Sequence, residues 1–169
     1  DAPVHPTPLV ESVAMGSVAA PVPKARPLLP ANWQSDKLLS TAQCETLIYA
    51  CEAFARDLPG QFRPSQLGTT VELAEDGHSY RQGFFLGDGT GAGKGRQIAG
   101  VMMDRWLSGE RRHIWITKNE ALLEDARRDW EALGGLPVDI QPLSRWKLGS
   151  PVTMAEGILF VTYPTLRSG

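Results

Sequence analysis

The residues of this chain best suited to chemistry form a glycine-rich stretch that runs from Gly87 to Arg96. A short apolar run at 84–86 precedes it, and a pattern typical of a helix continues from about Lys94 to Leu107. A strand, a glycine-rich turn and a helix in this order direct backbone N–H groups and the positive end of the helix towards a phosphate. We therefore predict a phosphate-binding loop, and the alternative is a turn that only reverses the chain. The residues expected to contact the nucleotide are Asp88, Gly89, Thr90, Gly91, Ala92, Gly93, Lys94, Gly95 and Arg96.

Two positions of this loop depart from the common pattern G-x-x-x-x-G-K-[ST]. Asp88 stands where the first glycine is expected, and Gly95 replaces the hydroxyl residue that follows Lys94. We favour a turn role for Asp88 over an outer-shell role at a metal. Arg96 could add positive charge near the phosphates or be a solvated residue of the first helical turn.

A helix from about Thr41 to Asp57 is predicted ahead of the loop by apolar residues at three- and four-residue spacings. Ser40 is a good N-cap, and Gln43 three residues later completes a capping-box pattern.

Apolar strands alternate with helices in the rest of the chain. Strands are predicted at 83–86, 113–117, 138–143 and 157–162, with a shorter one at 70–73. Helices are predicted at 94–107 and from about 119 to 133. This alternation indicates an α/β fold with a mostly parallel sheet that is covered on both faces. Ligands of such sheets bind beyond the carboxyl ends of the strands, where the glycine loop lies.

The chain divides at about residue 36 by its composition. Residues 1–36 hold seven of the 13 prolines and are predicted to form an extended Pro-rich arm, either as a linker or packed on a domain surface. Residues 37–169 would form the domain. A formal net charge of −2 gives no global field that favours nucleic acid or membrane, and no run of 18 apolar residues is present. We expect both ends to be cut from a longer protein.

Several blocks of this sequence resemble the strawberry notch family, whose nucleotide-binding domain belongs to the superfamily-two helicases and translocases. The resemblance covers nearly the whole chain, and the loop with Lys-Gly in place of Lys-Thr is quite specific for the family. The matching blocks are 5–12 in the arm, 39–43, 87–100, 118–122 and 157–163.

The resemblance implies a RecA-like P-loop NTPase domain, built as a three-layer sandwich, that binds ATP with Mg²⁺ and moves along nucleic acid. It implies that Lys94 is the catalytic cation at the outer phosphates and that Gln43 reads the adenine; the capping box is the alternative role for Gln43. Lys118 would lie where related enzymes contact nucleic acid. For Asn119 we favour a helix N-cap.

The acidic strand-end motif that holds the metal in related ATPases has no match in the sequence, where the last acidic residue is Glu156. We therefore assign no metal ligand to this chain, which leaves the metal to waters, phosphates and other carboxylates. The expected protein is the amino-terminal part of an incomplete ATPase domain. It would work with the remaining ATPase domains of the same polypeptide and would not hydrolyse ATP alone.

Two cations and an aromatic ring follow the strand predicted at 138–143, at Arg145, Trp146 and Lys147. Arg145 and Lys147 are candidates for nucleic-acid contact, together with Lys118. Trp146 and Trp33 are predicted to lie in loops and are the better candidates for base stacking, whereas the other tryptophans are expected in the core.

Three function classes follow from these features. We favour a fragment of a helicase-like, nucleic-acid-stimulated ATP hydrolase, which would also be DNA-binding. A nucleotide-dependent regulatory or scaffold module in transcriptional control is the first alternative. A small-molecule kinase or GTPase is the second, although the loop hydroxyl and a guanine-reading motif are missing. The expected location is intracellular, in the cytoplasm of a bacterium or phage host or in the nucleus of a eukaryote.

Overall fold

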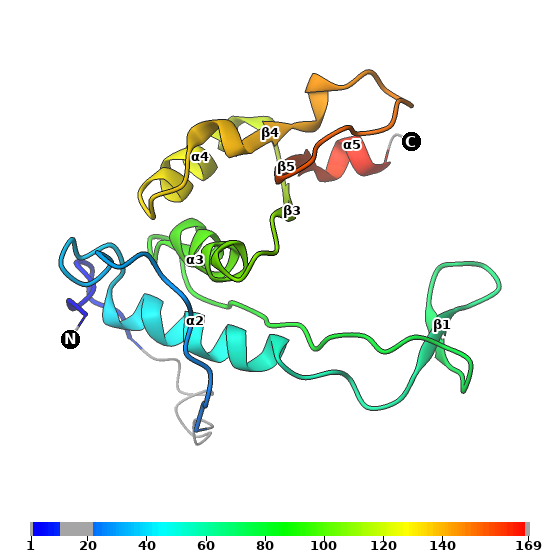
Figure 1. Ribbon diagram of the computed structural model, residues 1–169, viewed down its shortest axis with the longest axis horizontal. Coiled ribbons are helices and arrows are strands. Elements are labelled where there is room, and N and C mark those ends of the chain that lie inside the picture. Colours follow the sequence, from blue (N-terminus) through cyan, green and yellow to red (C-terminus); the bar gives the residue numbers. More distant parts are fainter. Residues whose placement is uncertain (1, 11–21, 168–169) are drawn as a thin grey trace.

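The computed structural model describes residues 2–10 and 22–167. Figure 1 shows two helices side by side, a small hairpin on an extension at one end of them, and a parallel sheet with further helices on the other side. The elements are α2 (Thr41–Phe54), β1 (Phe62–Pro64), β2 (Val71–Leu73), α3 (Lys94–Leu107), β3 (Arg112–Thr117), η1 (Glu120–Leu122), α4 (Leu123–Glu131), η2 (Pro137–Asp139), β4 (Ile140–Pro142), η3 (Leu143–Arg145), β5 (Gly157–Thr162) and α5 (Tyr163–Arg167).

The parallel sheet has the strand order β3-β5-β4, which confirms the prediction of a parallel α/β arrangement. Trp115 of β3 lies opposite Phe160 of β5, and Ile140 of β4 lies opposite Ile158. Ile158 and Phe160 belong to the buried core together with Trp130 of α4. The predicted strand at 138–143 is shorter than expected, because 3₁₀ turns flank β4 on both sides.

The sheet face opposite this core is open at β3. Ile114 and Ile116 alternate with Trp115 along the strand and are 62% and 43% exposed. The described helices therefore do not cover this part of the sheet, and the three-layer sandwich remains an expectation.

The two longest helices form the second part of the core. α2 begins at the predicted residue, and its capping box is present, with the Gln43 amide N–H donating to Ser40 Oγ at 3.4 Å and the Ser40 N–H donating to Gln43 Oε1 at 2.9 Å. α3 has the predicted bounds. Gly100 of α3 lets Leu47 of α2 come close. The buried cluster that joins the helices to the sheet contains Leu39, Leu47, Ala99, Met103, Ala126, Trp130, Leu133, Ile140, Ile158 and Phe160.

The segment between α2 and α3 differs from the prediction. β1 and β2 form an antiparallel hairpin; the strand at 71–73 was predicted, but its partner at 62–64 was not. The strand predicted at 83–86 is wrong for this structure, because that segment has no strand partner among the described residues. Phe85 is 90% exposed, while Phe84 and Leu86 line a cavity of about 200 Å³ against α2 and α3.

The described parts of the Pro-rich region contact the helices through backbone hydrogen bonds. The amides of Lys24 and Ala25 both donate to Glu52 Oε2 at 2.9 Å, and the Leu28 amide donates to Asp104 Oδ1 at 2.7 Å. Asp104 is only 2% exposed. Residues 11–21 of the predicted arm lie outside the described residues. Every helix in the described part of the chain is too short or too polar to cross a bilayer.

Candidate nucleotide-binding site

The glycine-rich loop leads directly into α3, as the sequence predicts. Gly91 and Gly93 have φ values of +90° and +74°, in the left-handed region that favours glycine. Gly93 is the N-cap residue of α3 and provides no side-chain cap. The N–H groups of the first turn are therefore not satisfied by a capping side chain, and an anion could accept their hydrogen bonds.

Lys94, the first residue of α3, folds back over the loop. Its Nζ donates to the backbone carbonyl oxygens of Asp88 and Gly89, each at 2.8 Å. These two bonds hold the ammonium group against the loop that precedes its own helix. An arriving phosphate would compete with the two carbonyls for the same donor.

Gln97 is a loop-supporting residue that sequence reasoning missed. Its side chain is 1% exposed, and its Nε2 donates to Asp88 Oδ2 at 2.9 Å and to the Ala92 carbonyl at 3.2 Å. Asp88 thereby braces the loop onto α3. The Gln97 Oε1 atom is buried without a hydrogen-bond partner. A polar residue on the core side of an otherwise apolar helix face was the available signal.

Gln43 contacts the same loop from α2. Its Oε1 is used by the capping box, and its Nε2 donates to the Ala92 carbonyl at 3.3 Å. The Gln43 amide also approaches Gly93 so closely that a Cβ at that position would clash with it. Two glutamine side chains from two helices therefore meet at one loop carbonyl. Reading an adenine would require Gln43 to release one of these contacts.

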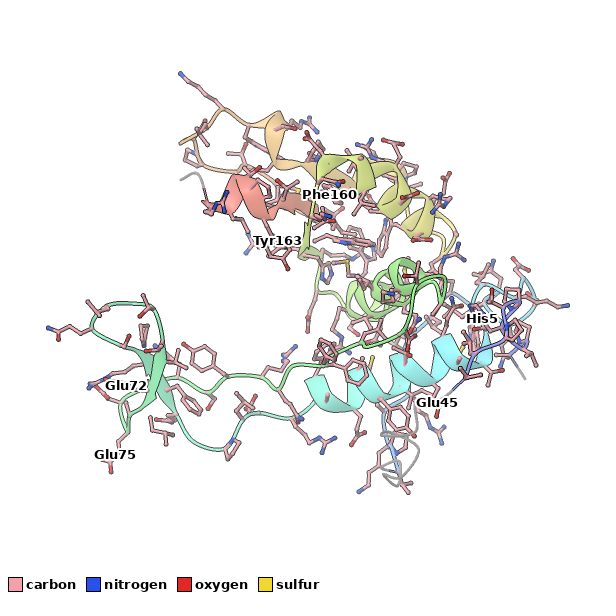
Figure 2. The ribbon with its side chains drawn as sticks, turned by 180° about the vertical axis from the view of Figure 1, so that it is seen from behind. His5, Glu45, Glu72, Glu75, Phe160 and Tyr163 are labelled. Atoms are coloured by element: carbon pink, nitrogen blue, oxygen red, sulfur yellow. The ribbon has the colours of Figure 1, made fainter. Side chains whose placement is uncertain are left out.

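A cavity of about 280 Å³ lies beside Gln43 and Gly93 and is closed on one side by residues 3–6. Figure 2 shows His5 in this segment beside the N-terminal end of α2. The Thr41 amide donates to the Pro3 carbonyl at 2.8 Å, which fastens the segment to the helix. The Pro-rich region thus forms a wall of the cavity that adjoins the phosphate loop.

Gly95 and Arg96 connect the loop to α4. Arg96 Nη1 donates to the Leu38 carbonyl at 3.1 Å, and its Nε lies 3.4 Å from Asp129 Oδ1. The Arg96 side chain is 25% exposed. Arg96 is therefore paired within the protein rather than solvated, and neither of these contacts involves the loop.

The nucleic-acid candidates lie at the carboxyl edge of the sheet. Lys118 follows β3, whose last residue pairs with Thr162 at the end of β5, and Arg145 and Lys147 follow β4. A cavity of about 370 Å³ opens at this edge, lined in part by Trp146, Lys147 and Thr162.

The side chains around this edge cavity are largely held in place. The Trp146 Nε1 donates to Thr153 Oγ1 at 3.3 Å, and the Arg145 guanidinium lies 5.9 Å from the Trp146 ring centroid. Asn119 occupies the N-cap position of η1, as predicted, although its side chain makes no capping hydrogen bond. Trp106 and Trp130 pack edge to face at 5.3 Å in the interior, as expected of core residues.

No group of three or more His, Cys, Asp or Glu residues that could hold a metal ion occurs within residues 2–10 and 22–167. Mg²⁺ in phosphate-transfer sites is usually held by one or two carboxylates, substrate phosphates and water. A magnesium site at this loop would therefore need only one or two oxygen ligands from the protein.

Comparisons with known proteins cover nearly the whole chain. The family model described as "P-loop containing NTP hydrolase pore-1" matches residues 4–169. The chain is 37% identical over 168 residues to Protein FORGETTER 1 of Arabidopsis thaliana, covering 97% of this chain and 12% of that protein. It is 32% identical over 162 residues to Protein strawberry notch homolog 2 of Mus musculus, covering 96% and 10%. It is 31% identical over 167 residues to Protein strawberry notch of Drosophila melanogaster, covering 96% and 9%.

The chain thus spans about a tenth of the length of these curated relatives. No solved structure matches it significantly.

Proposed function

The chain belongs to the strawberry notch family of P-loop NTP hydrolases, and on this premise we propose that it is the ATP-binding part of a helicase-like, nucleic-acid-stimulated ATPase. The parent protein would bind Mg·ATP at the loop and nucleic acid at the carboxyl edge of the sheet. The isolated chain would bind ATP without hydrolysing it.

The observation that carries the ATP-binding proposal is the arrangement of Lys94 at the uncapped start of α3. The ammonium group and the free first-turn amides converge on the loop mouth, and Lys94 is held there only by two exposed carbonyl contacts. A triphosphate offers stronger, charge-assisted acceptors to the same donors. Gln97 keeps the loop in place by donating to Asp88 Oδ2 and to the Ala92 carbonyl.

Calorimetric titration of ATP into the purified chain tests this proposal. Lys94→Ala should weaken binding about tenfold or more, since a hydrogen bond between charged groups contributes about 1.5–3 kcal/mol. Lys147→Ala is the matched control, because it removes the same charge at the sheet edge and should leave ATP affinity unchanged. Equal affinity of the Lys94→Ala variant and the unaltered chain would refute the proposed site.

We place the nucleobase where the cavity of about 280 Å³ is formed by Gln43 and residues 3–6, and the phosphates where it is formed by Gly93 of the loop. This cavity adjoins the loop and is lined by Gln43, whose amide bonds to Ser40 and Ala92 and would exchange one of these contacts for the base. If Gln43 reads the base, Gln43→Glu should change the ratio of ATP to GTP affinity, because the amide donor is lost. A role in capping alone would weaken both nucleotides equally.

We propose that the isolated chain does not hydrolyse ATP, because its sequence contains no match to the acidic motif. Phosphoryl transfer needs a positioned metal and an oriented attacking water, and the sequence has no acidic residue after Glu156. Phosphate release by the purified chain should stay at the buffer level. Steady release that Lys94→Ala abolishes would contradict this part of the proposal.

Nucleic acid is placed at the carboxyl ends of β3, β4 and β5, next to Lys118, Arg145 and Lys147. In the parent protein, Arg145→Glu with Lys147→Glu should weaken binding of a fluorescein-labelled single strand. The slope of log affinity against log salt should fall by about 0.7 for each lost phosphate contact. Arg128→Glu is the control, since Arg128 lies exposed on α4. Unchanged affinity and slope would remove this site.

A further inference from the structure

A carboxylate occupies the space where the phosphate loop lacks its hydroxyl side chain. A Cβ atom built on Gly95 would clash with Asp129 Oδ2, and the Asp129 Cγ would lie 3.3 Å away. Gly95 is the second residue of α3, so the direction of a side chain at this position is fixed by the helix. Asp129 therefore fills the place that a serine or threonine side chain would take.

The two oxygens of Asp129 have different surroundings. Oδ1 lies 3.4 Å from Arg96 Nε, while Oδ2 faces Gly95 and accepts no hydrogen bond from the described residues. The Asp129 side chain is 17% exposed, and it lines the cavity beside Gly93. One oxygen is thus used to orient the carboxylate, and the other remains available at the first turn of α3.

We propose that Asp129 replaces the missing loop hydroxyl and supplies the oxygen ligand from α4 to the magnesium ion of Mg·ATP. The inference rests on the proposed ATP binding at Lys94. The donor chemistry fits, because Mg²⁺ prefers oxygen ligands and takes one or two carboxylates beside phosphates and water. Arg96 Nε lies at ion-pair distance from Oδ1, 3.4 Å, without a hydrogen bond, and Gly95 provides the space for Oδ2.

The charge of Asp129 should affect ATP affinity in opposite directions with and without Mg²⁺. Without a metal ion, a carboxylate beside the phosphates repels them, so it lowers ATP affinity. With Mg²⁺ between them, the same carboxylate raises affinity. Asp129→Asn keeps the shape but removes the charge. It should therefore weaken Mg·ATP binding about tenfold while leaving metal-free ATP binding equal or tighter. A role in packing alone would change both affinities in the same direction.

The experiment is calorimetric titration of ATP into the 169-residue chain with excess Mg²⁺ and again with EDTA. The quantity compared is the magnesium ratio, which is the dissociation constant in EDTA divided by the dissociation constant in excess Mg²⁺. Asp125→Asn is the matched control, because it removes a carboxylate from the same helix where it pairs only with Arg128. A ratio that falls in Asp129→Asn and not in Asp125→Asn supports the proposal. An unchanged ratio in Asp129→Asn overturns it.

A second pair of variants moves the ligand back into the loop. Asp129→Ala empties the space beside Gly95, and Gly95→Ser in that background supplies a hydroxyl there. The double variant should regain the Mg²⁺ dependence that Asp129→Ala loses, and a double variant no better than Asp129→Ala contradicts the replacement. Electron paramagnetic resonance of Mn²⁺ with ATP gives a readout of the bound metal itself.

These results separate the two proposals. Metal-free ATP binding that depends on Lys94 tests the nucleotide site, whereas the magnesium ratio tests Asp129. If Lys94→Ala abolishes ATP binding but Asp129→Asn leaves the magnesium ratio unchanged, the proposed function stands and the role of Asp129 is refuted. A chain that binds no ATP under either condition overturns both.

Discussion

Replacing Asp104 by alanine should release the Pro-rich region from α3 and lower the stability of the whole domain. The Asp104 carboxylate is 2% exposed and accepts from the Leu28 amide at 2.7 Å. It also accepts from Arg105 Nη2 at 2.7 Å and from Cys51 Sγ at 3.3 Å. The charge of Asp104 and the burial of Cys51 together raise the pKa of that thiol to about 12, with burial as the larger cause. Cys51 therefore remains a neutral donor to Asp104 at physiological pH.

The loss of folding free energy depends on whether the partners of Asp104 can find water or another partner once the carboxylate is gone. Breaking a buried ion pair from one side costs about 3–5 kcal/mol when the remaining charge stays buried. The Arg105 side chain is 33% exposed and keeps Glu110 at 3.5 Å, so it can be rehydrated and the cost falls at the lower end. A loss of about 3 kcal/mol corresponds to a melting-temperature decrease of about 6–12 °C for a domain of this size.

Thermal unfolding followed by circular dichroism gives the global effect, and hydrogen exchange at the Leu28 amide gives the local one. Asp104→Ala should lose the protection of this amide, while Asp104→Asn, which keeps an acceptor oxygen, should fall between. Glu110→Ala is the control, because it removes an exposed partner of the same arginine. A melting temperature of Asp104→Ala that matches the control, or a Leu28 amide that stays protected, would refute the reasoning.

Three further predictions concern packing and pH. Gly100→Ala should cost about 1–3 kcal/mol in urea unfolding by overpacking, since its Cβ would lie 2.7 Å from Leu47 Cδ2, whereas Gly83→Ala meets open space and should be nearly neutral. Burial lowers the pKa of His113 below its ordinary 6.5, so the unfolded chain binds more protons below neutrality. Melting temperature should therefore fall as pH drops below about 6.5, and less so in His113→Gln. Hydrogen bonds from the two arm amides hold the pKa of Glu52 below its ordinary 4.5. The contribution of Glu52 is thus present above that value and lost as pH falls through the folded pKa, and Glu52→Ala should show less acid-induced loss of amide protection in residues 24–25.

Local patterns determined the elements that the sequence predicted well. Ser40 and Gln43 define the start of α2 through contacts within one turn, and the capping box is present as expected. α3 follows its glycine N-cap with the predicted bounds. The buried strand β5 consists almost entirely of apolar residues, so its position was evident from composition alone.

The features that escaped prediction depend on partners distant in sequence. The segment at 83–86 is apolar enough for a strand, but a strand requires a neighbour to receive its hydrogen bonds, and none of the described strands pairs with it. Asp129 lies on a helix rich in charged residues, and only the packing of α4 on α3 brings it to Gly95. Gln97 likewise gains its role only when the loop folds back over α3.

The strand order has a consequence for how the chain acquires its structure during synthesis. β5 follows both β3 and β4 in the sequence, yet it lies between them in the sheet and is the hydrogen-bonding partner of both. Among the described strands, β3 and β4 pair only with β5, so this three-stranded sheet cannot form in the order of the sequence. Closure of such long loops slows folding and leaves apolar strands unprotected meanwhile. We therefore expect β3 and β4 to join the sheet only when residues 157–162 are available to pair with them.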